Sequence, residues 1–223
     1  MTKKAFIIVL FLLSKLIVHP QSGNLNVKEW KSDLKTPSIF YISGDGGFNN
    51  FSTGLCNALN KEGYPVAALN ARSYFWKKRT PPETAVEFSA FLQKKIQGRS
   101  NQKLVLVGYS FGADVLPFIV NKLPDLVKKK LACIILLSPS TTTDFEIHWS
   151  DMLGSNKKRS MDVVAELNRM DSCKLITIFG SDENDFPVSA IKLQNYTNEK
   201  LPGGHHYEGN INVLANKIIK YFK

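Results

Sequence analysis

The sequence has little cysteine and little histidine. Its 223 residues include three cysteines, Cys56, Cys133 and Cys173, and only four histidines. No Cys-x-x-Cys pair occurs, and no cysteine or histidine has the spacing of a zinc site, so we predict neither a metal site nor a cofactor. Cys133 lies within an apolar run, which favours a buried free thiol over a disulfide.

Long hydrophobic runs and compositional bias are also missing. No stretch of about 20 apolar residues follows the N-terminal segment, which excludes a polytopic membrane protein. The 14 glycines and 10 prolines are scattered without a period, which excludes collagen and low-complexity disorder. The 43% of hydrophobic residues instead suffice for one folded domain with a sizeable core.

The N-terminal segment, residues 1–22, has the pattern of an export signal. Lys3 and Lys4 precede an apolar run over residues 5–13, and a polar, turn-forming stretch follows. This order predicts a secretory signal peptide, with an uncleaved anchor as the alternative, and leaves residues 23–223 as the folded domain.

Short apolar runs alternate with amphipathic segments of helical length, which is typical of an α/β fold with a mostly parallel sheet. The predicted strands are residues 38–42, 66–69, 104–107, 133–137 and 175–179. The predicted helices are residues 51–61, 82–95, 112–123, 161–169 and 211–222. Residues 140–160, in which Phe145, Ile147 and Trp149 alternate with polar residues, fit an extra edge strand, a small cap or a connector.

The strongest motif is Gly108-x-Ser110-x-Gly112. It follows an apolar strand directly and precedes a helical segment. In that context the glycines permit a sharp strand-to-helix turn that holds the serine hydroxyl out at the carboxyl edge of the sheet. Ser110 is therefore the candidate nucleophile.

A serine nucleophile needs a base, and the Gly-Gly-His205-His206 loop before the last helix is where α/β hydrolases carry it. We favour His205, because the glycine pair frees the backbone to bring its ring over Ser110, and keep His206 as the alternative. His148 lies in the alternating segment and is expected to face solvent or line a pocket.

The acid that orients the histidine is expected after the strand at 175–179, where three carboxylates lie close together. Glu183 has the commonest spacing from the strand-end glycine, and Asp185 and Asp182 remain alternatives. For the oxyanion hole we expect the Phe111 N–H, together with an N–H of Gly46 or Gly47 in the glycine-rich turn after the first core strand.

Four segments together resemble the bacterial VirJ/AcvB virulence-protein domain. They are residues 43–48 (SGDGGF), 73–83 (SYFWKKRTPPE), 108–118 (GYSFGADVLPF) and 201–207 (LPGGHHY). The likeness covers the chain from about residue 37 to its end, in the short single-domain form. It implies an α/β-hydrolase fold, serine hydrolase activity and an exported, periplasmic protein, with association with the inner membrane left open. It further implies cleavage of lysyl-phosphatidylglycerol, and a link to virulence and type IV secretion proteins.

This resemblance gives roles to charged residues around the motifs. Asp45 and Asp114 are carboxylates that could face the ammonium group of an aminoacyl ester, although a buried ion pair between Asp114 and Arg72 fits equally well. Arg72, Lys77, Lys78 and Arg79, interleaved with aromatic residues, could meet the lipid phosphate and the membrane surface. A basic loop with its aromatics in the core is the structural alternative.

Two other functions stay open. One is a hydrolase of small esters or acyl-peptides, and the other is a non-catalytic partner of a secretion apparatus that keeps the fold for binding. The net charge of +10 favours an anionic neighbour. We expect this neighbour to be an anionic phospholipid rather than nucleic acid, because the chain has no recognised basic helix or stacking platform.

Overall fold

A computed structural model describes residues 25–32, 37–97, 101–148, 158–170 and 173–223. The predicted signal peptide and Trp149 lie outside these residues. In the part of the chain that the structure describes, none of the helices combines the length and the hydropathy of a transmembrane span.

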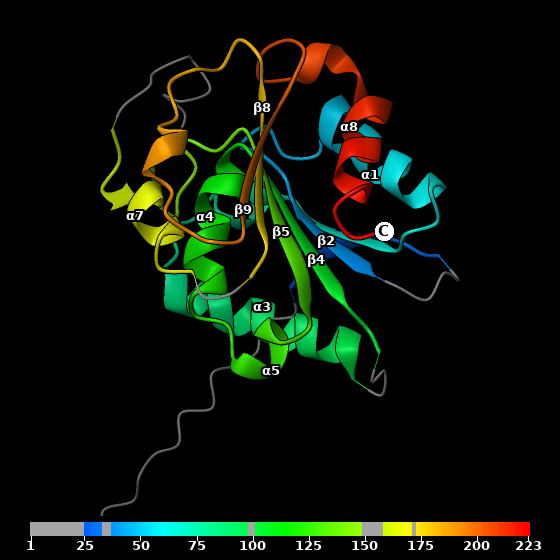
Figure 1. Cartoon of the computed structure of the whole chain (residues 1–223). Coiled ribbons are helices and arrows are strands. Elements are labelled where there is room, and N and C mark those ends of the chain that lie inside the picture. The colour runs from blue at the N-terminus through cyan, green and yellow to red at the C-terminus, as the bar shows by residue number, and fades with distance from the viewer. Residues whose placement is uncertain (1–24, 33–36, 98–100, 149–157, 171–172) are drawn as a thin grey trace, which may run out of the picture.

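The core of the described chain is a seven-stranded sheet in the order β1-β3-β2-β4-β5-β8-β9 (Figure 1). Only β1 runs antiparallel to its neighbour. The strands are β1 (Val27–Trp30), β2 (Ser38–Ile42), β3 (Val66–Leu69), β4 (Leu104–Tyr109), β5 (Leu131–Leu137), β8 (Leu175–Gly180) and β9 (Tyr196–Leu201). A separate two-stranded sheet joins β6 (Thr142–Thr143) to β7 (Met161–Asp162).

Helices cover both faces of the sheet. Buried side chains of α1 (Asn50–Lys61) and α8 (Ile211–Ile219) pack on one face. Those of α3 (Pro81–Ile96), α4 (Phe111–Val120), α5 (Asp125–Lys128) and α7 (Val163–Leu167) pack on the other. The central strands are buried on both faces and therefore read as continuous apolar runs. This arrangement confirms the predicted fold class.

The sequence pattern missed β9, which is functionally important because it leads into the histidine loop. β9 is the edge strand opposite β1, and most of its residues are only half buried. Its sequence, YTNEKL, is therefore polar and gives no apolar run. The pattern also missed β1, the short helix α2 (Ala71–Tyr74) and α5.

The segment with alternating aromatics is not an edge strand of the main sheet. The side chains of Phe145 and Ile147 are buried. The backbone groups of the same two residues form hydrogen bonds with the loop after α2. Arg79 N–H donates to the Phe145 carbonyl, and Ile147 N–H donates to the Phe75 carbonyl, each at 2.9 Å. These contacts attach residues 145–147 to the loop over residues 75–79. His148, in the same segment, forms a 2.8 Å pair with Asp144.

Candidate active site

Ser110 lies at the tight turn between β4 and α4, and its backbone is strained. Its φ of 51° is in the left-handed region that non-glycine residues rarely adopt. A Cβ on Gly108 would come within 2.5 Å of the Gly112 carbonyl oxygen, and one on Gly112 would overlap the Ile42 carbonyl oxygen. Both glycines are thus required by the close approach of backbone to backbone.

Replacing Gly112 by alanine is expected to lower the free energy of unfolding by about 2–4 kcal/mol, because the new methyl group must displace the backbone of β2. Urea unfolding of the purified protein measures this. Gly54→Ala is the matched control, since a Cβ there meets only the flexible end of the Ile211 side chain, and alanine favours the helix. A Gly112→Ala protein as stable as the Gly54→Ala protein would contradict the expectation.

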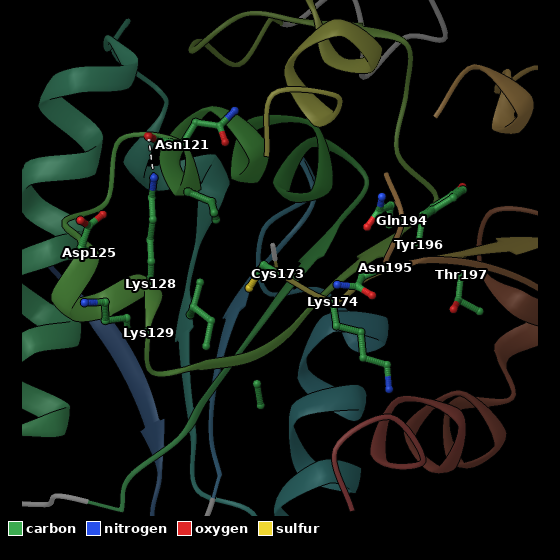
Figure 2. A pocket seen from close by; sticks show the side chains of 13 residues that line it. Asn121, Asp125, Lys128, Lys129, Cys173, Lys174, Gln194, Asn195, Tyr196 and Thr197 are labelled. Atoms are coloured by element: carbon green, nitrogen blue, oxygen red, sulfur yellow. Dashed lines mark hydrogen bonds between the residues drawn. The ribbon is translucent and has the colours of Figure 1, made fainter. Parts of the chain in front are cut away.

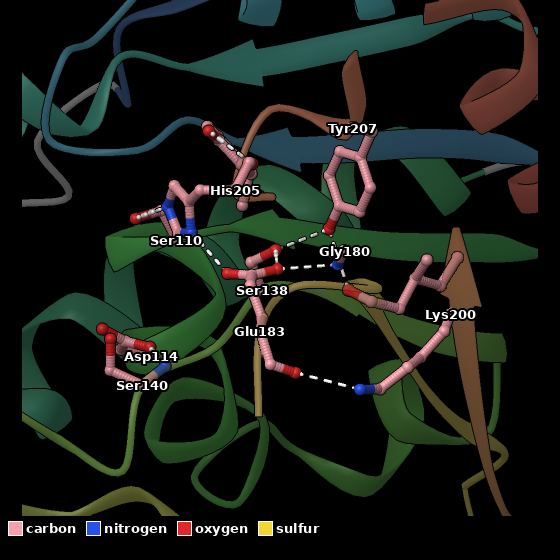
Figure 3. Close-up of polar contacts among 11 residues, drawn as sticks. Ser110, Asp114, Ser138, Ser140, Gly180, Glu183, Lys200, His205 and Tyr207 are labelled. Atoms are coloured by element: carbon pink, nitrogen blue, oxygen red, sulfur yellow. Dashed lines mark hydrogen bonds and ion pairs between the residues drawn. The ribbon is translucent and has the colours of Figure 1, made fainter. Parts of the chain in front are cut away.

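The structure brings Ser110, His205 and Glu183 together from three strand ends (Figure 3). Ser110 Oγ lies 2.9 Å from His205 Nε2, and His205 Nδ1 lies 2.8 Å from Glu183 Oε1. Ser110 follows β4, Glu183 follows β8 and His205 follows β9, so all three lie at the carboxyl edge of the parallel sheet. A nucleophilic serine, the base that takes its proton and the acid that orients the base are arranged in this way in serine hydrolases.

The alternatives to His205 and Glu183 lie differently. His206 is exposed, and its ring packs edge-on against Phe51. Asp182 and Asp185 are both exposed, and the carboxylate of Asp182 accepts a hydrogen bond from the neighbouring Ser181 hydroxyl. None of these three side chains is hydrogen-bonded to Ser110 or His205 in the described part of the chain.

The carboxyl group of Glu183 is held in its charged form. Partial burial alone would raise the pKa of Glu183, but hydrogen bonds from His205, Ser138 and the Gly180 N–H outweigh it and leave the pKa below its ordinary value. Lys200 fixes the same turn by donating to the Glu183 carbonyl at 3.1 Å and to Asn184 Oδ1 at 2.6 Å. A carboxylate is the form that can accept the histidine N–H.

The turn after β2 lies against the serine, but its hydrogen bonds correct the expected oxyanion donors. The Gly46 N–H donates to Asp45 Oδ1 at 2.8 Å, and the Gly47 N–H donates to the Gly44 carbonyl at 3.0 Å. Both expected donors are therefore engaged within the turn. Among the described residues, neither the Gly44 N–H nor the Asp45 N–H donates a hydrogen bond, so both can donate to an oxyanion.

The Phe111 N–H is also available. Phe111 is the first residue of α4, and the first N–H groups of a helix have no acceptor within it. The phenyl ring of Phe111 packs on buried Phe75 at 5.2 Å between centroids, which fixes the residue after the serine.

Asp114 is buried, which corrects its expected role as a contact for a substrate ammonium group. Its side chain is 5% exposed, and its Oδ1 accepts the Ser140 N–H at 2.6 Å. No ion pair with Arg72 occurs among the described residues. Burial raises the pKa of Asp114 to about 7, against the opposite effect of its hydrogen bonds with Ser140. Asp114 therefore ties α4 to the loop after β5.

Asp114→Asn is expected to stabilise the protein above neutral pH. The pKa of Asp114 is about 7 in the folded protein and about 4 in the unfolded chain. Between these two pH values the folded protein binds the proton more tightly than the unfolded chain, so the free energy of unfolding falls as pH rises from about 4 to about 7. Asparagine stays neutral and keeps an acceptor for the Ser140 N–H. At pH 8 we expect a gain of up to about 4 kcal/mol, measured by urea unfolding between pH 4 and pH 8.

The control for this change is Asp125→Asn, at an exposed carboxylate in α5. It is expected to leave the pH dependence of stability as in the wild type. An Asp114→Asn protein whose stability declines with pH as steeply as the wild type would show that Asp114 is already charged at neutral pH.

In the basic loop after α2, some side chains form contacts within the fold and others are exposed to solvent. Arg79 forms ion pairs with Glu87 at 2.9 Å and Glu83 at 3.6 Å, and its guanidinium lies 3.9 Å from the centre of the Tyr74 ring. It is thus part of the fold, contrary to its expected role at a lipid phosphate. Lys77 and Lys78 are exposed. Arg72 is half buried, with its Cβ close to Gly47.

A groove of about 870 Å³ lies away from this site (Figure 2). Its lining includes Lys128, Lys129 and Lys174, and it lies at the amino ends of β5, β8 and β9. Ser110 lies at the carboxyl ends, so the groove belongs to the opposite edge of the sheet. Lys128 and Lys174 already donate to the backbone carbonyls of Asn121 and Tyr221. Among the described residues, no group of histidine, cysteine and acidic side chains could hold a metal ion.

Two residues that contact Glu183 or its partners were not predicted from the sequence. Ser138, directly after β5, donates to Glu183 Oε2 at 2.6 Å, and the Tyr207 hydroxyl lies 2.7 Å from Ser138 Oγ. Ser138 carries no motif. Tyr207 ends the segment 201–207 that resembles the VirJ/AcvB domain, but the sequence assigns no role to its hydroxyl.

Comparison with known proteins supports the fold. The chain is similar to a lipase-esterase related protein from Clostridium acetobutylicum (15% identity, TM-score 0.61, 88% of this chain and 99% of that one). It is also similar to Est1E from Butyrivibrio proteoclasticus (12% identity, TM-score 0.60, 87% and 90%). A third similar structure is a thioesterase domain from the curacin biosynthetic pathway (17% identity, TM-score 0.57, 86% and 94%).

A search of curated proteins finds no match. The family model described as bacterial virulence protein (VirJ) matches residues 36–223, which confirms the family expected from the four sequence segments. The chain therefore belongs to the VirJ family of bacterial virulence proteins and has the α/β-hydrolase fold of esterases and lipases.

Proposed function

We propose that this protein is an exported serine esterase that cleaves the aminoacyl ester of phosphatidylglycerol, most readily the lysyl ester, in the periplasm. The observation that carries the proposal is the hydrogen-bonded chain from Ser110 through His205 to Glu183, at 2.9 and 2.8 Å. A module that only binds a partner has no need of a serine hydroxyl on a strained turn with a base and a carboxylate behind it.

The proposed reaction has two halves. Ser110 Oγ attacks the ester carbonyl while His205 Nε2 takes the hydroxyl proton, and the Phe111 N–H with an N–H of Gly44 or Asp45 stabilises the oxyanion. The intermediate then collapses, and His205 returns the proton to the glycerol oxygen of the departing lipid. In the second half, water gives its proton to His205 and attacks the acyl-serine, which releases the free amino acid and restores Ser110.

Two features support an aminoacyl lipid as the substrate, beside the family resemblance. Asp45 carries a half-buried carboxylate in the turn beside Ser110, where it can attract a cationic amino group. Lys77 and Lys78 are exposed in the loop whose Phe75 packs on Phe111, so two positive charges lie on a segment next to the nucleophile turn. An anionic lipid phosphate would be attracted by that charge.

Lipid extraction from cells with and without the gene tests the proposal. Aminoacyl-phosphatidylglycerol should accumulate without the gene and return to its normal level with the wild-type gene, but not with a Ser110→Ala version. Equal rescue by Ser110→Ala would overturn the enzymatic function. Unchanged lipid in all strains, with short-chain esters hydrolysed by the purified protein, would favour the small-ester alternative.

A further inference from the structure

Two buried hydroxyl groups lie behind the carboxylate of Glu183 (Figure 3). Ser138 and Tyr207 are each only 2% exposed. Ser138 Oγ lies 2.6 Å from Glu183 Oε2 and 2.7 Å from the Tyr207 hydroxyl, which also lies 2.8 Å from the Ile178 carbonyl oxygen. The Gly180 N–H reaches the same Glu183 Oε2 at 2.7 Å.

The count of hydrogens fixes the direction of these bonds. Glu183 is charged and can only accept, so the Ser138 hydrogen points to Glu183 Oε2. Burial raises the pKa of Tyr207 well above its ordinary value, so its hydroxyl keeps its hydrogen and shares it between Ser138 Oγ and the Ile178 carbonyl. Oε2 thus receives two donors from within the fold. Oε1 is left for His205.

The same two residues have strained backbones. Ser138 has a φ of 49° and Tyr207 a φ of 51°, a region that side chains other than glycine, asparagine and aspartate rarely adopt. Ser138 follows β5 and Tyr207 lies two residues after His205, so their hydroxyl contact joins the end of β5 to the histidine loop across the acid. Strain of this kind persists where surrounding contacts over-determine the conformation, and it concentrates at functional sites.

We propose that Ser138 and Tyr207 are positioning residues that hold Glu183 with its Oε1 facing His205 Nδ1, and so keep His205 oriented toward Ser110. This inference rests on the proposed serine-hydrolase function. Neither hydroxyl touches the reacting atoms. Their effect passes through Glu183, which Ser138 contacts directly and Tyr207 contacts through Ser138.

The test is the rate at which a fluorophosphonate probe labels Ser110 in the purified protein. Ser138→Ala is expected to slow labelling about tenfold, and Tyr207→Phe about fivefold, because loss of a hydrogen bond that orients a functional side chain typically lowers activity by about one order of magnitude. Ser52→Ala and Tyr196→Phe are matched controls. Ser52 Oγ lies 3.0 Å from the Tyr41 hydroxyl and Tyr196 lies 2.7 Å from Thr177 Oγ1, so each control also breaks a hydroxyl pair, but one that does not contact Glu183.

A second measurement separates positioning from general weakening of the fold. The proton between His205 Nδ1 and Glu183 is expected as a far-downfield resonance in the NMR spectrum of the wild type and of both controls. It should shift or broaden in Ser138→Ala and Tyr207→Phe, at temperatures where melting curves show all proteins folded. Tyr207→Phe keeps its ring in the core and serves if Ser138→Ala does not fold.

The outcomes are distinguishable. Labelling rates and downfield resonances equal to those of the controls would overturn the positioning role and leave the serine hydrolase standing. No labelling of the wild type, with an intact fold, would overturn the proposed function and this inference with it.

Discussion

Replacing Ser110 by alanine is expected to lower kcat/KM for ester hydrolysis by about 10⁶-fold, because the nucleophile of a serine hydrolase acts as one unit with its base and acid. Hydrolysis of an ester substrate by purified protein measures this. Ser189→Ala, at an exposed serine in η1 (Val188–Ala190), is the control and should retain wild-type activity. A Ser110→Ala protein with activity within tenfold of the wild type would contradict the role of Ser110.

Because the backbone at Ser110 is strained, a substitution at this position also changes the stability of the protein. Ser110→Gly removes the hydroxyl and also relieves the cost of a φ of 51°, since glycine adopts this region freely. We expect the glycine variant to be inactive and about 1 kcal/mol more stable than the alanine variant in urea unfolding. The alanine variant keeps a Cβ and therefore keeps the strain.

The sequence predicts those parts of the site where only one or a few residue types are possible. Gly108 and Gly112 flank Ser110 because a side chain at either position would collide with the backbone. The result is the Gly-x-Ser-x-Gly motif, which can be recognised in the sequence. The base could be narrowed to two residues because the chain has only four histidines. The buried parallel strands likewise read directly from their apolar runs.

The parts that sequence could not predict depend on hydrogen-bond partners. Gly46 and Gly47 can approach a substrate as closely as any glycine, but their N–H groups are engaged inside the turn. Arg79 lies in a basic segment rich in aromatic residues, which is typical of a phosphate or membrane contact. In the structure, however, it pairs with Glu83 and Glu87 of the helix that follows. Ser138 is one of many serines, and only the register of β5 against β8 brings it to Glu183.

Glu183→Gln is expected to lower kcat by about 10³–10⁴-fold, although the side chain keeps its size. Two donors, the Ser138 hydroxyl and the Gly180 N–H, meet at the Oε2 position, so the glutamine amide will turn its oxygen toward them. Its NH₂ group then faces His205 Nδ1 and donates to it. That tautomer carries its proton on Nε2, where it cannot accept the Ser110 proton.

Asp182→Asn and Asp185→Asn are the matched controls for this substitution, since both carboxylates lie in the same turn and are exposed. Each is expected to keep kcat within about threefold of the wild type, as for a surface charge outside the site. The comparison uses steady-state hydrolysis with all four proteins at equal folded fraction. A loss at Asp185 or Asp182 larger than the loss at Glu183 would assign the orienting carboxylate to that residue instead. In that case the hydrogen bonds of Ser138 and Gly180 to Glu183 Oε2 would have no effect on catalysis, because Glu183 would not be the carboxylate that orients His205.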